Sequence, residues 1–313
     1  MIEPSDVQAA ARRVAGRIRR TPLIEVDPGP LAAAGRMWLK LELTQHSGSF
    51  KARGAFNHIL AARDEGRLPD AGVVAASGGN AGLAFAYAAS QVGVSAEVFV
   101  PETAPAVKVA RLRALGAQVV QVGTRYAEAQ DAATKRAADT GALFCHAYDQ
   151  PEVCAGQGTL GLEILEQTGG EVDTVLLAVG GGGLIAGVAT ALDGHARAVG
   201  VEPETIPTLE RALHAGRPVD VDVSGIAADS LGATRLGDIA FAVASRTGVL
   251  PALVTDEAII EARRFVWDEY RLVVEHGTAA AVAALRTGAY RPSAGERVVV
   301  VLCGANTDPS DLV

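Results

Sequence analysis

Apolar residues recur along this chain in short runs, and most runs are followed by a longer segment in which they are spaced as on one face of a helix. Short apolar runs bounded by turn residues are typical of buried strands, and the longer spacing is typical of helices. Regular alternation of the two predicts parallel sheets with right-handed crossover connections. We predict strands at 73–77, 96–100, 118–122, 143–146, 174–179, 196–202 and 297–303, and helices at 81–90, 105–115, 126–139 and 151–167.

The strand and helix units between residues 72 and 149 are short and follow one another without a low-complexity linker. We expect them to form a small domain, while residues 1–71 and 150–313 form a larger, discontinuous domain. In an open α/β sheet, ligands bind at the carboxyl ends of the strands. The chain places its loops of small residues at those ends, so we expect the functional site there.

The composition supports this fold class and limits the kinds of binding partner that the protein could have. The 313 residues are 49% hydrophobic but only 4% aromatic, which suits helices packed closely on buried parallel strands. The net charge of −8 argues against nucleic acid as the main partner, because such binding depends on clustered Lys and Arg. One local cluster of positive charge comprises Arg12, Arg13, Arg17, Arg19 and Arg20. We interpret it as the solvated face of a helix that is predicted to begin at Ser5, with Gln8 in a capping box.

The cysteines and the pattern of apolar residues indicate the cellular compartment of the protein. The three cysteines, Cys145, Cys154 and Cys303, form no CxxC pair, which indicates neither a disulfide framework nor a zinc site. The chain opens on polar residues without the apolar region of a signal peptide, and no apolar stretch is long enough to span a bilayer. We therefore expect a cytoplasmic protein with no membrane partner.

Lys51 lies between a turn of small residues and an apolar helix, soon after the segment 38–43, whose alternation predicts a half-buried strand. A lysine held at such a junction can be desolvated, which lowers the pKa of its amine and makes it a nucleophile for carbonyl groups. This suggests a Schiff-base lysine for an aldehyde cofactor. Position alone favours a surface lysine in the first turn of a helix, so other motifs must decide.

Four consecutive glycines, Gly180, Gly181, Gly182 and Gly183, follow the predicted strand 174–179. Glycines at a strand-to-helix turn leave the backbone N–H groups of the helix N-terminus open to an anion such as phosphate. A tight turn alone would need only one or two glycines. Residues 181–186 also fit a dinucleotide fingerprint, with Glu202 about 20 residues on, so an NAD-dependent oxidoreductase is an alternative.

Two further loops stand at predicted strand ends. Ser77, Gly78, Gly79 and Asn80 precede a helix, where they could hold a carboxylate or serve as an ordinary N-cap. Cys303 ends the last predicted strand, where a cysteine is usually a small buried hydrophobe but could also face a ligand.

Together and in this order, these motifs resemble those of the fold-type II (tryptophan synthase β-like) family of pyridoxal 5′-phosphate enzymes. Within the family, the chain looks most like the serine/threonine dehydratase and serine racemase branch. The resemblance covers nearly the whole chain, at segments 41–42, 49–55, 77–80, 155–159, 180–183 and 302–306.

The resemblance implies two three-layer α/β/α domains with parallel sheets, pyridoxal 5′-phosphate as cofactor, an amino-acid substrate and a homodimer. It also implies a role for each motif. Lys51 would carry the cofactor in a Schiff base, and its phosphate would be cradled by Gly180, Gly181, Gly182 and Gly183. Phe50 and Gly232 would lie against the two faces of the cofactor ring, Asn80 would bond its 3-hydroxyl, and Cys303 would lie beside its pyridine nitrogen. The substrate carboxylate would be bound by Ser77, Gly78, Gly79 and Asn80.

The activity implied is dehydration of threonine, serine or a related 3-hydroxy amino acid to a 2-oxo acid and ammonia. Departures from the family pattern bear on the alternatives. Cys303 replaces the usual Ser, and a thiol is a weak donor that would leave the ring nitrogen mostly unprotonated, which favours elimination over racemisation. Gly78 stands where the racemase branch has Ser, and Ala81 stands where His is usual, which leaves a roomier pocket.

A β-replacement enzyme, as in cysteine or cystathionine synthesis, is a close rival on the same fold. The loop 77–80 speaks mildly against it, because those enzymes carry a Thr-Ser-Gly-Asn type of loop. A catalytically silent amino-acid-binding protein is a further alternative. The branch's divalent-cation site would use Glu202, but its Asp partner is missing; Glu204 or Glu210 could substitute, and a solvated loop is the favoured interpretation.

Overall fold

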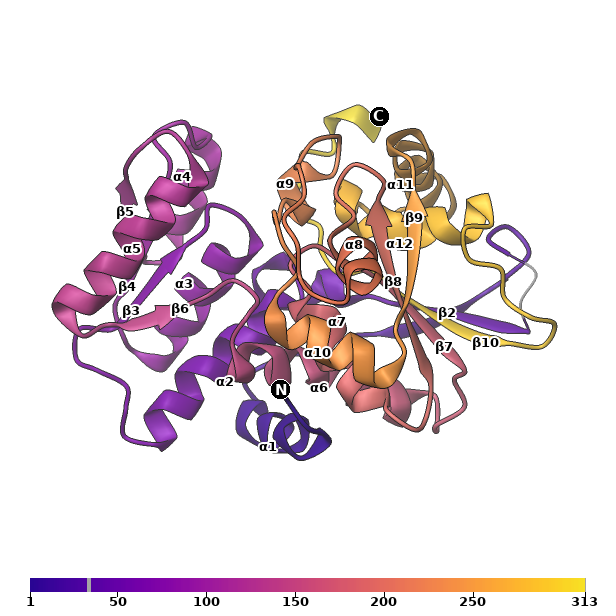
Figure 1. Ribbon diagram of the computed structural model, residues 1–313, viewed down its shortest axis with the longest axis horizontal. Coiled ribbons are helices and arrows are strands. Elements are labelled where there is room, and N and C mark those ends of the chain that lie inside the picture. Colours follow the sequence, from indigo (N-terminus) through magenta and orange to yellow (C-terminus); the bar gives the residue numbers. More distant parts are fainter. Residues whose placement is uncertain (33–34, 313) are drawn as a thin grey trace.

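A computed structural model describes residues 1–32 and 35–312, which form two lobes, each built on its own sheet (Figure 1). The six-stranded sheet has the order β1-β2-β10-β7-β8-β9, and the four-stranded sheet has the order β5-β4-β3-β6. Every neighbouring pair is parallel except β1 and β2. The strands are β1 (Leu23–Val26), β2 (Arg36–Lys40), β3 (Val73–Ala76), β4 (Ala96–Val100), β5 (Gln118–Gln121), β6 (Leu143–Cys145), β7 (Thr174–Ala178), β8 (Arg197–Pro203), β9 (Leu250–Val254) and β10 (Arg297–Val301).

Helices cover both faces of the four-stranded sheet. Alanines of α5 (Tyr126–Thr140) pack against side chains of β3 and β4 on one face. On the other face, α3 (Asn80–Val92) and α4 (Ala106–Ala114) share a core with α2 (Lys51–Asp64). The small lobe is therefore a three-layer α/β/α sandwich, as expected.

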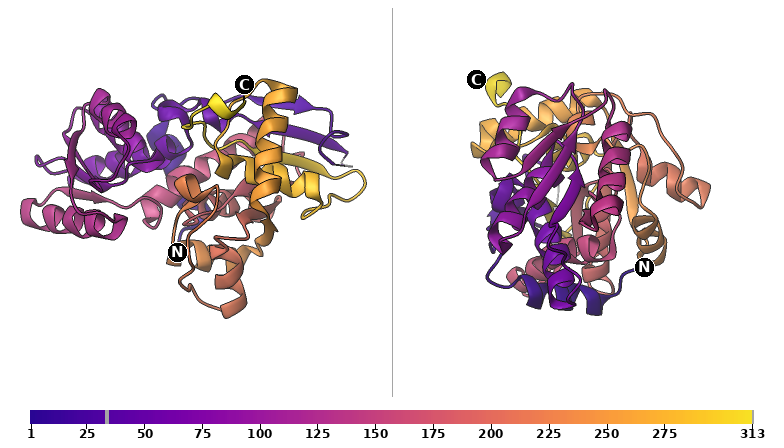
Figure 2. Two further views of the ribbon diagram at one scale, coloured as in Figure 1. Left: turned by 90° about the horizontal axis from the view of Figure 1, so that it is seen from above. Right: turned by 90° about the vertical axis from the view of Figure 1, so that its left-hand side faces the viewer.

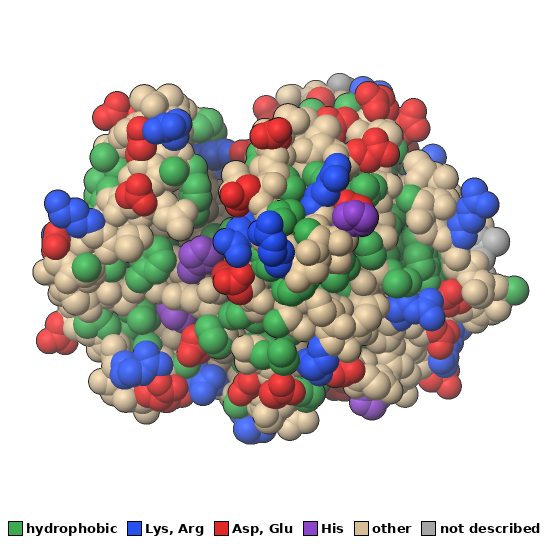
Figure 3. All heavy atoms as spheres, viewed as in Figure 1, with side chains coloured by type: hydrophobic (Ala, Val, Ile, Leu, Met, Phe, Trp, Pro, Cys, Tyr) green, Lys and Arg blue, Asp and Glu red, His purple; other side chains and the backbone are tan. Residues whose placement is uncertain are grey.

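The six-stranded sheet is covered in the same way (Figure 2). The helices α6 (Pro151–Gln167), α7 (Gly183–Leu192) and α10 (Asp238–Thr247) lie on one face, and α11 (Asp256–Tyr270) and α12 (His276–Thr287) lie on the other. The short helices α8 (Thr208–Ala215) and α9 (Ala228–Leu231) follow β8. On the face shown in Figure 3, the surface is hollowed between the two lobes.

We propose that the small lobe spans residues 72–149 and is inserted into a large lobe made of 1–71 and 150–313. Helix α2 joins the two, because it packs against α3 of the small lobe and α6 of the large one. Within the described ranges, no helix is long and apolar enough to cross a membrane.

Two local expectations were wrong. The segment 38–43 was expected to be a half-buried strand, but β2 ends at Lys40 and its residues 37–40 are all buried, because the Lys40 ammonium is paired inside the protein with Glu163. The first helix, α1 (Pro4–Val14), begins before Ser5, and the carboxylate of Asp6, not Gln8, accepts the backbone N–H of the N-cap residue Glu3.

The arginine-rich segment, which spans the last turn of α1 and the residues after it, is mostly exposed and partly paired. Arg13 forms an ion pair with Asp64 at the end of α2, and Arg20 forms one with Glu166 on α6. The Arg19 guanidinium donates to the carbonyl of Thr44. These contacts attach the N-terminal segment to the large lobe and to α2.

Candidate active site

Lys51 is the first residue of α2 and points into the protein. Its Nζ donates to the carbonyl of Ala147 at 2.7 Å and lies 5.1 Å from the ring centre of Phe50. The backbone N–H of Phe50 donates to the carbonyl of Cys303 at 3.0 Å. The junction before α2 is thereby fixed to the end of β10, while the amine reaches the loop that follows β6.

The environment of Lys51 favours a neutral amine. Burial lowers the pKa of Lys51 to about 8, and weaker attraction from the Glu275 carboxylate opposes this. No carboxylate among the described residues lies within ion-pair distance of Nζ. Desolvation without an ion-pair partner is the condition under which a lysine amine becomes a nucleophile.

Behind Lys51, a cluster of buried charges holds the first turn of α2. The Arg53 guanidinium is fully buried and donates to Glu42 at 2.7 Å and to Glu163 at 2.9 Å. Lys40, also fully buried, pairs with the other oxygen of Glu163. The cluster joins β2, α2 and α6, so it sets the position of the helix that presents Lys51.

The four glycines lie at the N-terminus of α7, at the carboxyl end of β7. Gly182 is its N-cap residue with φ +90°, a conformation that glycine adopts without strain. A β-carbon at Gly181 would lie 2.4 Å from the Tyr148 ring, and one at Gly183 would lie 2.8 Å from the Tyr148 carbonyl oxygen. No hydrogen bond between described residues uses the backbone N–H of Gly181, Gly182 or Gly183. Open N–H groups and a close-fitting backbone suit a phosphate group.

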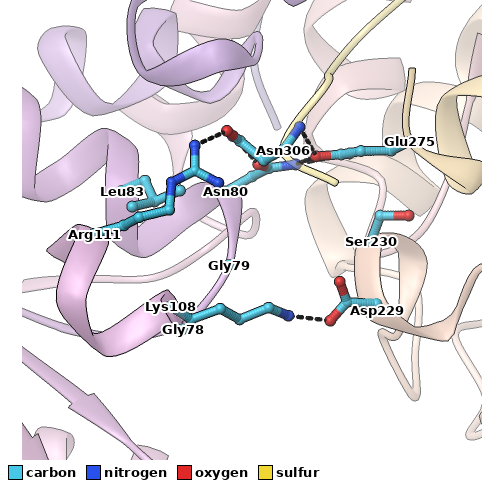
Figure 4. A pocket seen from close by; sticks show the side chains of 10 residues that line it. All are labelled: Gly78, Gly79, Asn80, Leu83, Lys108, Arg111, Asp229, Ser230, Glu275 and Asn306. Carbon is cyan, nitrogen blue, oxygen red and sulfur yellow. Dashed lines mark hydrogen bonds and ion pairs between the residues drawn. The ribbon is translucent and has the colours of Figure 1, made fainter. Parts of the chain in front are cut away.

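The loop 77–80 lies in the small lobe, at the N-terminus of α3. Asn80 makes the contacts to the large lobe: its Nδ2 donates to both oxygens of Glu275 at 2.9 Å, and its Oδ1 accepts from Asn306 at 2.6 Å. Gly78 and Gly79 line a pocket beside it (Figure 4), and the Ser77 hydroxyl accepts the N–H of Gly79 at 3.2 Å.

Cys303 follows β10 and is buried. Its sulfur lies 3.1 Å from Oγ1 of Thr278, which also accepts the N–H of Gly304 at 3.0 Å. Burial raises the pKa of the Cys303 thiol to about 12, with a smaller opposing effect from Thr278, so the thiol keeps its proton at neutral pH. Gly232 is exposed at the C-terminus of α9, next to Leu231, whose backbone approaches Gly180.

The loop of residues 146–149 is part of the site, and our sequence reasoning missed it. Ala147 accepts from Lys51, and the adjoining Tyr148 covers Gly181. Nδ1 of His146 accepts the backbone N–H groups of Tyr148 and Asp149. His146 ends the predicted strand 143–146 and the other residues follow it, so the rule that ligands lie at the carboxyl ends of strands could have found them.

Glu202 does not face the cleft. Its carboxylate accepts from the backbone N–H groups of Leu209 and Glu210 and from the Thr208 hydroxyl, at 2.7 to 3.0 Å. Burial raises the pKa of Glu202 to about 7, and these hydrogen bonds oppose the increase. In the described part of the chain, no group of three ligand-type side chains could hold a metal ion.

A family model described as "Pyridoxal-phosphate dependent enzyme" matches residues 14–304. The chain belongs to this family. Its cofactor is therefore pyridoxal phosphate, and its fold is fold type II. The NAD alternative is set aside by this match, and Glu202, its expected ribose ligand, is occupied by the N-terminus of α8.

Members of the family with named activities are similar over most of the chain. An L-threonine ammonia-lyase of Thermotoga maritima is 36% identical over 98% of this chain and 76% of its own length. A phenylserine dehydratase of Ralstonia pickettii is 38% identical over 93% of this chain and 89% of its own. The crystal structure of a threonine deaminase from T.th. matches with a TM-score of 0.89 and 38% identity, covering 98% of this chain and 99% of that one.

The lowered pKa of Lys51 predicts how the apoprotein takes up its cofactor. Only the neutral amine adds to an aldehyde, so attachment of pyridoxal phosphate will accelerate with rising pH around a midpoint near 8, not near the ordinary lysine value of 10.5. Stopped-flow absorbance from pH 6.5 to 10.5 measures this rate. A midpoint above 10 would contradict the desolvation of Lys51.

Proposed function

We propose that the protein is a pyridoxal phosphate-dependent ammonia-lyase that converts L-threonine, L-serine or a related 3-hydroxy amino acid to a 2-oxo acid and ammonia. One observation carries the proposal: the desolvated amine of Lys51 and the four-glycine loop are joined through consecutive residues, because Ala147 bonds Nζ and Tyr148 covers Gly181. An aldehyde and a phosphate on one small molecule would meet these two features together.

The residues present fit the cofactor. Lys51 would hold its aldehyde carbon, and the N–H groups of 180–183 would hold its phosphate. Phe50 and Gly232 would flank the ring, Asn80 would face its 3-hydroxyl, and Cys303 would stand beside the ring nitrogen. When bound, the cofactor supplies an electron sink for the bond broken at the α-carbon.

The chain's own groups then position the substrate and move its protons. The backbone of 77–80, at the N-terminus of α3, binds the α-carboxylate. The neutral amine of Lys51 takes the α-proton, for which a pKa near 8 is suitable, because a base works best when its pKa lies close to the working pH.

Cys303 favours elimination over racemisation. A thiol with a pKa of about 12 carries no negative charge at neutral pH, so it does not stabilise a protonated ring nitrogen. Beside this thiol the bound cofactor would supply a weaker electron sink, which would favour loss of the β-hydroxyl over return of the proton. Reprotonation from the opposite face would also need an acid there, and Gly78 supplies none.

The proposal is tested with purified holoenzyme and a panel of L-threonine, L-serine and phenylserine, measured by release of ammonia and 2-oxo acid. Ammonia release from at least one of them supports it. Formation of a thioether when serine is supplied with a thiol, without 2-oxo acid, would identify a β-replacement enzyme. Binding of the amino acids without any product would identify a silent binding protein.

The variant Gly78→Ser is expected to gain racemase activity. A β-carbon at Gly78 meets only a Val100 methyl carbon, at 3.5 Å, so a serine fits without displacing the loop. Its hydroxyl would offer an acid on the face opposite Lys51, and positioned proton donors contribute roughly 10²-fold or more. Chiral chromatography of L-serine reactions should show D-serine at least about tenfold above wild type. Gly79→Ser, which also fits, is the control, and equal D-serine from both variants would contradict the role of position 78.

A cytoplasmic location and a homodimeric assembly are part of the same proposal. The three cysteines are free and buried, as is usual in a reducing compartment. Sedimentation velocity of the holoenzyme tests the dimer.

A further inference from the structure

The loop 146–149, between β6 and α6, connects two parts of the site (Figure 1). The carbonyl oxygen of Ala147 accepts from Nζ of Lys51 at 2.7 Å. The ring of the next residue, Tyr148, occupies the space that a β-carbon on Gly181 would need. Both contacts depend on the backbone conformation of the loop. A change in that conformation would take the lysine from its acceptor and the ring from the glycines.

His146 holds the inside of this loop. Its Nδ1 atom accepts the backbone N–H groups of Tyr148, at 3.3 Å, and of Asp149, at 2.9 Å. Its ring lies edge-on to the Tyr148 ring, with 4.7 Å between the ring centres and 77° between the planes. The backbone N–H of His146 donates in turn to the Gln150 side chain at 2.9 Å. One imidazole thus contacts both residues that follow Ala147 in the loop.

The peptide group between Ala147 and Tyr148 links His146 to Lys51. In a planar trans peptide, the N–H and the C=O point in opposite directions. The N–H of this peptide points to Nδ1 of His146, so its carbonyl points away from the imidazole, toward Nζ of Lys51. Rotation of the peptide would break both hydrogen bonds at once. The acceptor atom of His146 therefore orients the carbonyl that holds Lys51.

The imidazole of His146 is held in one protonation state. Only an unprotonated Nδ1 can accept these two N–H groups, so the proton of the neutral ring lies on Nε2. Burial lowers the pKa of His146; attraction to Asp149 opposes this, and the charge of a protonated Lys51 adds to the decrease. The ring is therefore neutral at pH 7, and its acceptor atom is available to the loop.

The other contacts of the loop do not hold this peptide. The Cys154 thiol donates to the Tyr148 carbonyl at 3.0 Å, and the Asp149 carboxylate accepts two backbone N–H groups at the N-terminus of α10. These contacts attach the far end of the loop to the large lobe. Among the described residues, His146 is the single hydrogen-bond partner of the Tyr148 N–H.

We propose that His146 is a positioning residue for Lys51: its Nδ1 orients the peptide 147–148, whose carbonyl holds the amine where the cofactor aldehyde is attached. This inference rests on the proposed role of Lys51. A lysine side chain has many rotamers, and an acceptor in a fixed direction restricts them before the aldehyde binds. Because His146 holds the loop, it also keeps Tyr148 against the glycines that would bind the phosphate. Loss of the acceptor should therefore weaken binding of the cofactor.

Two variants separate the acceptor atom from the rest of the side chain. In His146→Asn, the amide oxygen is as many bonds from the α-carbon as Nδ1, and asparagine readily accepts backbone N–H groups two residues on. In His146→Gln, the oxygen is one bond further out. We expect the dissociation constant of pyridoxal phosphate, from equilibrium dialysis of the holoenzyme, to rise at least about tenfold in His146→Gln and less than about threefold in His146→Asn. His195→Gln, at an exposed histidine, is the control and should match wild type.

Hydrogen exchange of the wild-type holoenzyme tests the contact without a substitution. The N–H groups of Tyr148 and Asp149, resolved by mass spectrometry with fragmentation, should exchange at least about tenfold more slowly than in an unstructured peptide. His146→Asn should keep this protection, and His146→Gln should lose it. Rapid exchange in the wild type would overturn the inference, even if both variants failed to fold.

Equal affinity of the two variants for the cofactor, whether both are weak or both resemble wild type, would also overturn the inference. The proposed function would stand in that case, provided that borohydride reduction traps the cofactor on Lys51. Wild-type holoenzyme without a trapped adduct on Lys51 would overturn the proposed attachment itself, and the inference with it.

Discussion

Replacing Lys51 by alanine will abolish both turnover and covalent retention of pyridoxal phosphate. Alanine has no amine to attach the aldehyde and no base to take the α-proton, and each loss alone costs a large factor. General acid–base catalysis contributes about 10²–10⁴-fold, and the nucleophile is lost as well, so kcat should fall by at least about 10³-fold. The measurements are 2-oxo acid formation and mass spectrometry after borohydride reduction.

Lys135→Ala serves as the control, because Lys135 is an exposed lysine on α5. It should retain wild-type activity and the cofactor adduct at residue 51. Wild-type release of 2-oxo acid by Lys51→Ala, or a reduced adduct on another lysine, would show that residue 51 has been given the wrong role.

Removing one member of the buried charge cluster will destabilise the protein strongly. Glu163→Ala takes away the acid that pairs with Lys40 and Arg53, and both cations lie in a fully buried environment. A buried charge left without its partner costs about 3–5 kcal/mol. We expect the free energy of unfolding to fall by about that amount, measured by urea unfolding followed by circular dichroism.

The matched control lies one turn further along the same helix. Glu166 also pairs with an arginine, Arg20, but both side chains of that pair are more than half exposed, at 70% and 56%. Exposed pairs contribute about 0–1 kcal/mol, so Glu166→Ala should shift the unfolding midpoint little. Similar shifts for the two variants would mean that the cluster does not stabilise α2 in the way its burial indicates.

The roles of Lys51 and of the four glycines could be proposed from the sequence because both motifs are local, and these roles stay predictions. A lysine at a strand-to-helix junction and a run of glycines before a helix restrict what the backbone can do there. The fold class followed from the strand and helix alternation for the same reason. The described structure and the family match agree with the predicted fold class.

Other features could not be predicted because they depend on contacts between distant segments. Ala147 acts through its carbonyl, which any residue would supply. Glu275 and Asn306 contact Asn80 only because the two lobes meet at the cleft. Lys40 is a polar position in an alternating segment, a pattern that is typical of the exposed face of a strand. It is buried because Glu163 on α6 lies beside it and pairs with its ammonium group.

The order of strands in the large sheet has a consequence for how the chain folds during synthesis. Strand β10, near the C-terminus, lies between β2 and β7 and pairs with both. On the ribosome, the four strands of the small lobe are complete long before β10 emerges, so that lobe can condense first. Until the last segment is translated, β2 and β7 keep unsatisfied edges that could pair with other nascent chains. Aggregation of C-terminally shortened chains should therefore start from the large lobe.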